Sequence, residues 1–126
     1  MSTLTLRLLN ENFAIHSVAA DKEIPKQVFE APIFFIAKTF EETSLVLPSN
    51  IDIDSEDVEP DWQALEVVGP LDFSLTGILS SISTVLANEK ISIFAISTFD
   101  TDYILVKSNK INHAVTALRN NNYQVI

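Results

Sequence analysis

The stretch that decides the fold is Gln63–Ile126, which reads QALEVVGPLDFSLTGILSSISTVLANEKISIFAISTFDTDYILVKSNKINHAVTALRNNNYQVI. Its first seven residues alternate in polarity, as a half-buried strand does. Residues 74–88 place leucine, isoleucine and valine at helical spacing in a single apolar stripe. The runs 91–97 and 102–107 are rich in strand-forming residues and flank a polar turn. These patterns predict strand, helix, strand and strand in this order.

The end of the chain completes the pattern with one more helix and one more strand. The sequence KINHAVTALRNN repeats the helical spacing and is preceded by a cap at Ser108 or Asn109, and YQVI predicts a short last strand. For the earlier helix, we expect Asp72 or Ser74 to cap the start and Asn88 to end it. The order βαββαβ predicts a ferredoxin-like α+β fold, an antiparallel sheet with its helices on one face.

The first half of the chain is less regular. TLRLLN and FAIHSV predict a hairpin around residues 10–12, IPKQVF predicts a single helical turn, and PIFFIAK and TSLVL predict two more strands. The segment PSNIDIDSEDVEPD, residues 48–61, has six acidic residues, two prolines and no apolar period, which indicates a linker. We therefore expect two tandem units, a degenerate copy of the fold with the acidic linker over residues 1–60 and a complete one over residues 61–126.

The composition excludes several classes of function. Apolar residues make up 47% of the 126 residues, enough for a packed core, and no apolar run approaches the roughly 18 residues of a bilayer span. Because the start, MSTLTLRLLNENF, lacks a basic region and a cleavage site, we expect a soluble, cytoplasmic protein. A net charge of −9 disfavours nucleic acids and anionic membranes as partners, since binding them requires neutralised phosphates.

The residue types also disfavour an enzyme, a metal site and a cofactor. The chain has no cysteine and two histidines, His16 and His113, neither near the serines and threonines of the polar turn. Asp100 and Asp102 lie two apart at that turn, a spacing that turns adopt for ordinary hydrogen bonding. The acidic segment from Asp52 lacks the glycine and the bidentate glutamate of a calcium-binding loop.

Two segments favour a binding site for a small molecule. Both glycines of the chain fall in GPLDFSLTGIL, and Gly77 sits in a first helical turn, where glycine costs up to about 1 kcal/mol relative to alanine. We expect a ligand or a neighbouring chain to approach this backbone closely, although plain helix packing is an alternative. Free N–H groups at the helix start suit a carboxylate, and Ser97, Thr98 and Asp100 at the strand end suit an ammonium group. Together they match a free α-amino acid, whereas a turn stapled by its own side chains is the competing interpretation.

The segment Trp62–Lys107 resembles the ACT domain family, specifically the CASTOR-type ACT domains of small two-domain bacterial proteins, and GPLDFSLTGIL and STFDTDYILV carry the resemblance. The first half is similar to a leading, weaker ACT-like unit. The resemblance implies a non-catalytic sensor that binds a small ligand, most often an amino acid, between ACT units. The ligand-binding residues that it implies are, at the helix start, Asp72, Phe73, Ser74, Gly77 and Ile78, and, at the strand end, Ile96, Ser97, Thr98, Phe99, Asp100 and Thr101.

The resemblance also implies partners. A complete site between subunits would need a homodimer, and a sensor would act on a regulated protein partner. The chain departs from the animal arginine sensors because it has two ACT-like units instead of four, so the identity of the ligand does not carry over. A structural dimerisation or protein-interaction domain without a ligand is the alternative function. An RNA-binding domain of the same topology is disfavoured, because few basic residues lie near Phe94 of its central strand.

Overall fold

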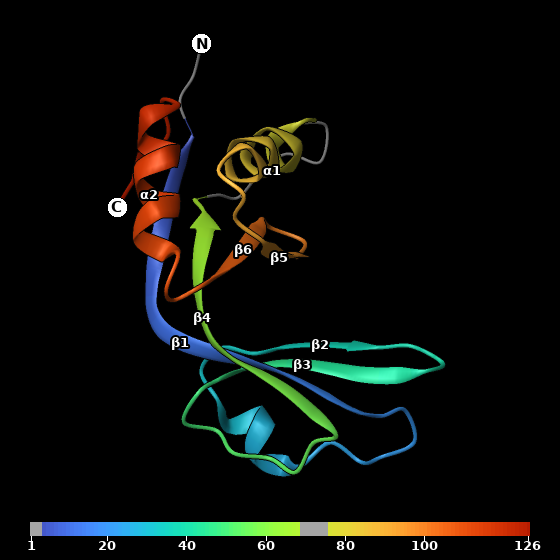
Figure 1. Ribbon diagram of the computed structural model, residues 1–126. Coiled ribbons are helices and arrows are strands. Elements are labelled where there is room, and N and C mark those ends of the chain that lie inside the picture. Colours follow the sequence, from blue (N-terminus) through green and yellow to red (C-terminus); the bar gives the residue numbers. More distant parts are fainter. Residues whose placement is uncertain (1–3, 69–75) are drawn as a thin grey trace. The chain divides into compact units, whose positions relative to one another are not determined.

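The computed structural model describes residues 4–68 and 76–126 (Figure 1). The elements in chain order are β1 (Thr5–Ala19), the 3-10 helix η1 (Lys26–Glu30), β2 (Phe35–Lys38), β3 (Glu42–Pro48), β4 (Asp57–Val67), α1 (Ile78–Asn88), β5 (Ile93–Ser97), β6 (Asp102–Lys107), α2 (Ile111–Asn120) and β7 (Gln124–Val125). Asp72, Phe73 and Ser74 of the expected helix start lie outside the described residues. The fold is therefore mixed α and β, with two α-helices in the described part.

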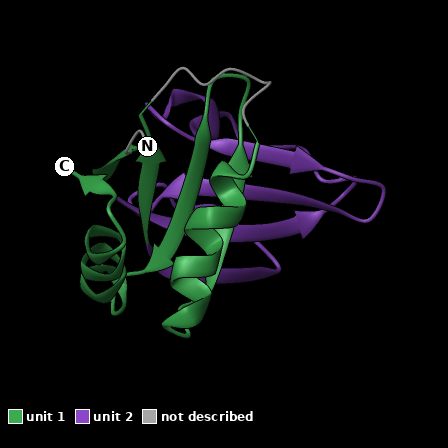
Figure 2. Ribbon diagram, turned by 90° about the horizontal axis from the view of Figure 1, so that it is seen from above, with its two compact units in different colours: residues 1–10, 63–126 green, residues 11–62 purple. Residues whose placement is uncertain are grey.

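The chain divides into two compact units, which Figure 2 colours separately. Unit 1 comprises residues 1–10 and 63–126, and unit 2 comprises residues 11–62. This division differs from the expected 1–60 and 61–126, because the first ten residues group with the C-terminal part. Strand pairing explains the difference, since Thr5 and Leu6 of β1 pair in parallel with Gln124 and Val125 of β7.

Unit 1 has the expected order of elements, β4-α1-β5-β6-α2-β7. The start of β1 is hydrogen-bonded to β4, β4 to β6, and β6 to β5, while β7 pairs with β1 on its other side. Strands β5 and β6 form an antiparallel hairpin in which Ile93 pairs with Val106 and Ser97 pairs with Asp102. The βαββαβ prediction is confirmed, and a strand from the N-terminus lies between its first and last strands.

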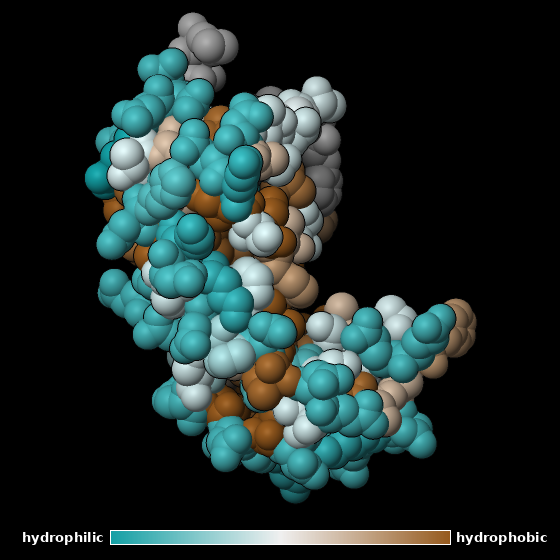
Figure 3. All heavy atoms as spheres, in the orientation of Figure 1, coloured by the Kyte–Doolittle hydropathy of each residue, from teal (hydrophilic) through white to brown (hydrophobic). Residues whose placement is uncertain are grey.

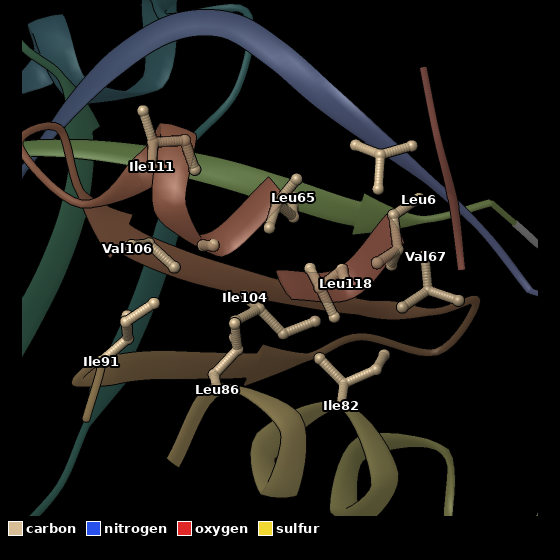
Figure 4. Packing of buried hydrophobic residues seen from close by; sticks show 12 residues of the cluster. Leu6, Leu65, Val67, Ile82, Leu86, Ile91, Ile104, Val106, Ile111 and Leu118 are labelled. Carbon is tan, nitrogen blue, oxygen red and sulfur yellow. The ribbon is translucent and has the colours of Figure 1, made fainter. Parts of the chain in front are cut away.

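The core of unit 1 forms where both α-helices pack on this sheet, and Figure 4 shows it from close by. Helix α1 contributes Ile82 and Leu86, and helix α2 contributes Leu118, each with no exposed surface. Ile111 and Ala114 of α2 belong to the same cluster. Facing the helices are residues of the strands and of the connecting segments: Leu6, Leu65, Val67, Ile91, Ile104, Val106 and Val125. Burial of one such aliphatic side chain contributes about 1.5–3 kcal/mol, so this cluster is the main stabilising feature of the unit.

The helix ends agree only in part with the predictions from sequence. Helix α1 ends at Asn88 as expected, but it begins at Ile78, after Gly77. Helix α2 begins after Lys110, and no side chain caps it, so the expected cap at Ser108 or Asn109 is wrong. The Lys110 carbonyl instead accepts the first helical hydrogen bond, from the Ala114 N–H at 2.9 Å. Packing of the apolar face therefore holds this helix without a polar cap.

Unit 2 is built on β2 and β3, the two strands expected here, which pair as an antiparallel hairpin, and on the rest of β1. Strand β3 pairs antiparallel with β1 from Pro48 opposite Phe13 to Glu42 opposite Ala19. Its own core contains Val18, Val28, Leu45, Leu47 and Ile53. The single helical turn predicted from IPKQVF is confirmed as η1.

Two expectations for the first half are wrong. The hairpin around residues 10–12 does not exist, because β1 runs as one strand of 15 residues through this segment. The Asn12 carbonyl accepts a hydrogen bond from the Ser49 N–H at 2.8 Å, so this polar segment continues the strand instead of turning. The acidic linker over 48–61 is also shorter than expected, since Asp57–Asp61 already belong to β4. Charged residues are compatible with this strand because each of these five side chains is exposed.

The surface is largely polar. Figure 3 shows hydrophilic side chains over most of the face in view, in keeping with the strongly acidic composition. Phe40, in the turn between β2 and β3, is fully exposed. Within residues 4–68 and 76–126, the structure contains no helix of the length and hydrophobicity that a bilayer crossing requires.

Candidate functional site

The turn between β5 and β6 is held together by its own polar side chains. The Thr98 N–H donates to the Thr101 carbonyl at 2.8 Å, and the Thr98 hydroxyl oxygen accepts from the Thr101 N–H at 3.2 Å. The Ser97 hydroxyl donates to Asp102 Oδ1 at 2.6 Å, across the last pair of the hairpin. The described residues with positive φ lie elsewhere in the chain, so this turn does not need a glycine. Asp102 therefore stabilises the turn through its hydrogen bond with Ser97.

An open pocket of about 310 Å³ lies beside this turn in unit 1. The residues that line it are Arg7, Glu66, Val68, Thr98, Asp100, Thr101 and Tyr103. Side chains alternate along a strand, and Leu6, Leu65 and Ile104 face the helices. Their neighbours Arg7, Glu66 and Tyr103 therefore point to the opposite face of the sheet. The pocket thus lies on the side of unit 1 that the helices do not cover.

Three neighbouring strands contribute to a hydrogen-bonded group on this face. Arg7 Nη1 lies 3.0 Å from Glu66 Oε1, and the Tyr103 hydroxyl donates to Glu66 Oε2 at 2.9 Å. Burial raises the pKa of Tyr103 to about 12, and the Glu66 carboxylate, as hydrogen-bond acceptor and as a negative charge, acts in the same direction with a smaller contribution from Asp100. Both Glu66 oxygens are therefore engaged, and Tyr103 remains protonated at neutral pH.

The turn contributes the remaining polar groups of the pocket. The Thr101 side chain is buried, and its hydroxyl donates to the Val67 carbonyl, which ties the turn to β4. Asp100 is exposed, and within the described part of the chain its carboxylate accepts no hydrogen bond. The pocket therefore combines an ion pair, Arg7 with Glu66, and a carboxylate at Asp100 that is available to a cationic group.

The structure brings some of the expected strand-end residues together at the pocket. Thr98, Asp100 and Thr101 line it, whereas Ser97 is occupied with Asp102. Ile96 pairs with Tyr103 across the hairpin, and the Phe99 side chain is 80% exposed. Neither Ile96 nor Phe99 lines the pocket.

The expected helix-start residues that the structure describes lie elsewhere. Gly77 precedes α1 with φ +78°, in the left-handed region, and no described atom lies within 4 Å of the position that a Cβ would take. The close approach of a ligand or a neighbouring chain to this backbone stays a prediction; the left-handed conformation by itself accounts for the glycine. Ile78 packs against the hydrophobic core of unit 1.

Four residues of the pocket were not identified from the sequence, namely Arg7, Glu66, Val68 and Tyr103. Alternation in TLRLL and ALEVV already places Arg7 and Glu66 opposite the apolar residues of their strands. The pairing of β1 with β4 was not evident, because the sequence pattern assigned these strands to different units. Without this pairing, nothing in the sequence connects the two charges.

The two histidines lie apart from the pocket. His16 is buried in unit 2, its Nδ1 lies 3.0 Å from Ser55 Oγ, and burial lowers its pKa against the opposing attraction of Asp52. His113 Nε2 lies 2.8 Å from Glu89 Oε1 at the surface of unit 1. Among the described residues, no group of three or more potential ligands could hold a metal ion.

Comparison with protein families gives one match, to the ACT domain, over residues 57–120. A comparison with curated protein sequences found no match. The family match contains all of β4, α1, β5, β6 and α2. It therefore includes every described pocket residue except Arg7.

Solved structures share the fold over nearly the whole chain. Protein Atu0741 from Agobacterium tumefaciens is 31% identical, with 100% of this chain and 94% of that chain covered and a TM-score of 0.90. VC0802 from Vibrio cholerae, a protein of unknown function, is 18% identical, with 94% and 89% covered and a TM-score of 0.72. The regulatory subunit of aspartate kinase from Thermus thermophilus is 12% identical, with 91% and 95% covered and a TM-score of 0.67. At 18% and 12% sequence identity, the likeness of these last two proteins to this chain concerns the fold alone.

Proposed function

The chain belongs to the ACT domain family, and we propose that it is a non-catalytic regulatory module, of CASTOR type, that binds a free amino acid. One observation carries the proposal: Thr98, Asp100 and Thr101, which were expected to contact the ligand, line an open pocket of about 310 Å³. A pocket of this size fits one small molecule.

The charge of the pocket supports an ammonium group as one end of the ligand. Asp100 carries a carboxylate to which no described residue donates a hydrogen bond, and Thr98, whose hydroxyl is bonded to the Thr101 backbone, lines the same pocket. A charge-assisted hydrogen bond from an ammonium group to a carboxylate is about twice as strong as a neutral one. Ser97, Ile96 and Phe99 would then support the turn more than contact the ligand.

The helix start remains part of the proposal as the second side of the site. Asp72, Phe73 and Ser74 lie outside the described residues. Gly77 and Ile78 follow them in the sequence, where helix α1 begins. The family resemblance supports these five positions. Assembly as a homodimer would complete a site between subunits, and a protein partner in the cytoplasm would respond to the occupied state.

Thermal unfolding with each of the twenty amino acids tests the proposal. At a concentration 100 times its Kd, a ligand that binds the folded state stabilises it by about 2.7 kcal/mol. Asp100→Asn should reduce this stabilisation, whereas Asp21→Asn, which removes the same charge from an exposed position in unit 2, should not. If none of the twenty amino acids raises the unfolding temperature, the proposal fails, and an interaction domain without a ligand becomes the better account.

A further inference from the structure

Arg7 is the one cation among the described residues that line the pocket, and the family match does not include it. We infer that Arg7 binds the α-carboxylate of the amino acid whose ammonium group contacts Asp100, an assignment that rests on the proposed function. The N-terminal strand β1 thereby supplies a binding residue from outside the matched segment 57–120.

The geometry of Arg7 suits this role. Its side chain is 50% exposed, and it uses Nη1 for the contact with Glu66 Oε1 at 3.0 Å. A guanidinium has five N–H donors in a planar fork, so donors remain for a carboxylate in the pocket. Such a fork binds carboxylates with two parallel hydrogen bonds, which fixes orientation as well as affinity.

Glu66 is paired with Arg7, and Tyr103 holds Glu66 in place. The Tyr103 hydroxyl donates to Glu66 Oε2 at 2.9 Å, which holds the carboxylate that in turn contacts Arg7. Glu66 is well shielded, with 21% of its side chain exposed, so this contact is less screened than an ordinary surface ion pair. The same carboxylate also competes with a ligand for the charge of Arg7.

The charges define the class of ligand. Of the described residues, one cation and two carboxylates line the pocket, in a chain with a net charge of −9. A simple anion is repelled by Asp100 and Glu66, and a simple amine leaves the remaining N–H donors of Arg7 without a ligand group to bind. A molecule with adjacent positive and negative groups satisfies both ends, and a zwitterionic α-amino acid is the smallest common one.

The test measures binding by calorimetry for the amino acid with the largest thermal shift and for its methyl ester, which lacks the carboxylate. The proteins are the wild type, Arg7→Gln and the control Lys26→Gln, which removes the same charge from an exposed position in unit 2. Loss of a hydrogen bond to a charged group weakens binding by about tenfold or more, so Arg7→Gln should lose this factor for the amino acid. It should bind the ester as the wild type does, and Lys26→Gln should match the wild type for both.

Glu66→Gln provides a second test with the opposite sign. It removes the carboxylate that competes for Arg7, while the glutamine carbonyl can still accept from Tyr103. Binding of the free amino acid should become several-fold tighter, whereas a purely structural ion pair predicts weaker binding for both Arg7→Gln and Glu66→Gln. This test holds even if Arg7→Gln does not fold.

The outcomes separate this assignment from the proposed function. If the wild type and Arg7→Gln bind the amino acid equally, the carboxylate is bound elsewhere and the assignment is overturned, while amino-acid binding stands. If Glu66→Gln weakens binding, the assignment is overturned as well. If the wild type binds none of the twenty amino acids, the proposed function fails, and the role of Arg7 falls with it.

Discussion

Replacement of Gly77 by alanine tests the explanation of this glycine. Its φ of +78° lies in the left-handed region, and no described atom lies within 4 Å of the position of an added Cβ. The described atoms therefore add no steric term. The left-handed conformation itself costs a residue with a Cβ about 1–2 kcal/mol. Loss of the flexibility of glycine in the unfolded chain returns about 0.4–1 kcal/mol, so the net expected loss of stability is between about 0 and 1.6 kcal/mol.

Urea denaturation at neutral pH measures this difference, with Gly77→Asn as the matched control. Asparagine adopts the left-handed region more readily than alanine, so it should lose less than half as much stability. The amino-acid affinity of Gly77→Ala is measured in parallel, because the proposed site at the helix start expects a ligand to approach this backbone.

Two results would refute this reasoning. A loss above about 3 kcal/mol is too large for the backbone term and would indicate a packing clash. A tenfold loss of amino-acid affinity with unchanged stability would support the idea that a ligand approaches this backbone.

Three further outcomes are expected. Leu118→Ala should lower the free energy of unfolding by about 2–5 kcal/mol, because this side chain has no exposed surface. Phe40→Ser, at a fully exposed position, should change the free energy of unfolding by less than about 0.5 kcal/mol in the same urea titration. Because burial lowers the pKa of His16, stability should fall as the pH drops below 6.5, the ordinary pKa of histidine. His16→Gln should flatten this slope in unfolding curves measured between pH 7.5 and 5. An unchanged slope would contradict the burial argument. Because the pKa of Tyr103 is raised to about 12, its contribution to stability should be complete below pH 10 and lost as the pH rises toward 12. In an ultraviolet titration, Tyr103→Phe should remove the highest ionisation step. A titration in which this step remains would contradict the assignment.

Much of the proposed site is encoded locally. The strands 91–97 and 102–107 were expected at nearly their observed positions, and four residues between them form a turn whose internal hydrogen bonds span at most five positions. Such contacts depend on neighbours in sequence, so residue types alone indicate them. Both helices follow from apolar spacing in the same way, and the local patterns therefore predicted most elements of unit 1.

The conformation at Gly77 was less accessible to sequence reasoning. Glycine at a helix start is compatible with close packing, with a ligand or with positive φ, and the residue type does not distinguish these causes. The hairpin expected at residues 10–12 failed for a related reason. Asn, Glu and Asn are turn formers in isolation, but pairing with β3 on the same strand outweighs this preference.

What the sequence by itself determined is therefore the order of strands and helices in the C-terminal half and the polar turn beside the pocket. The tertiary structure alone decided that β1 lies next to β4, and with it that Arg7 meets Glu66, 59 positions away. Periodicity records which face of a strand is buried but not which strand lies beside it. Pairing between distant strands is decided by the combined packing of the whole sheet, so the charge that we assign to the ligand's carboxylate became evident only in the folded chain.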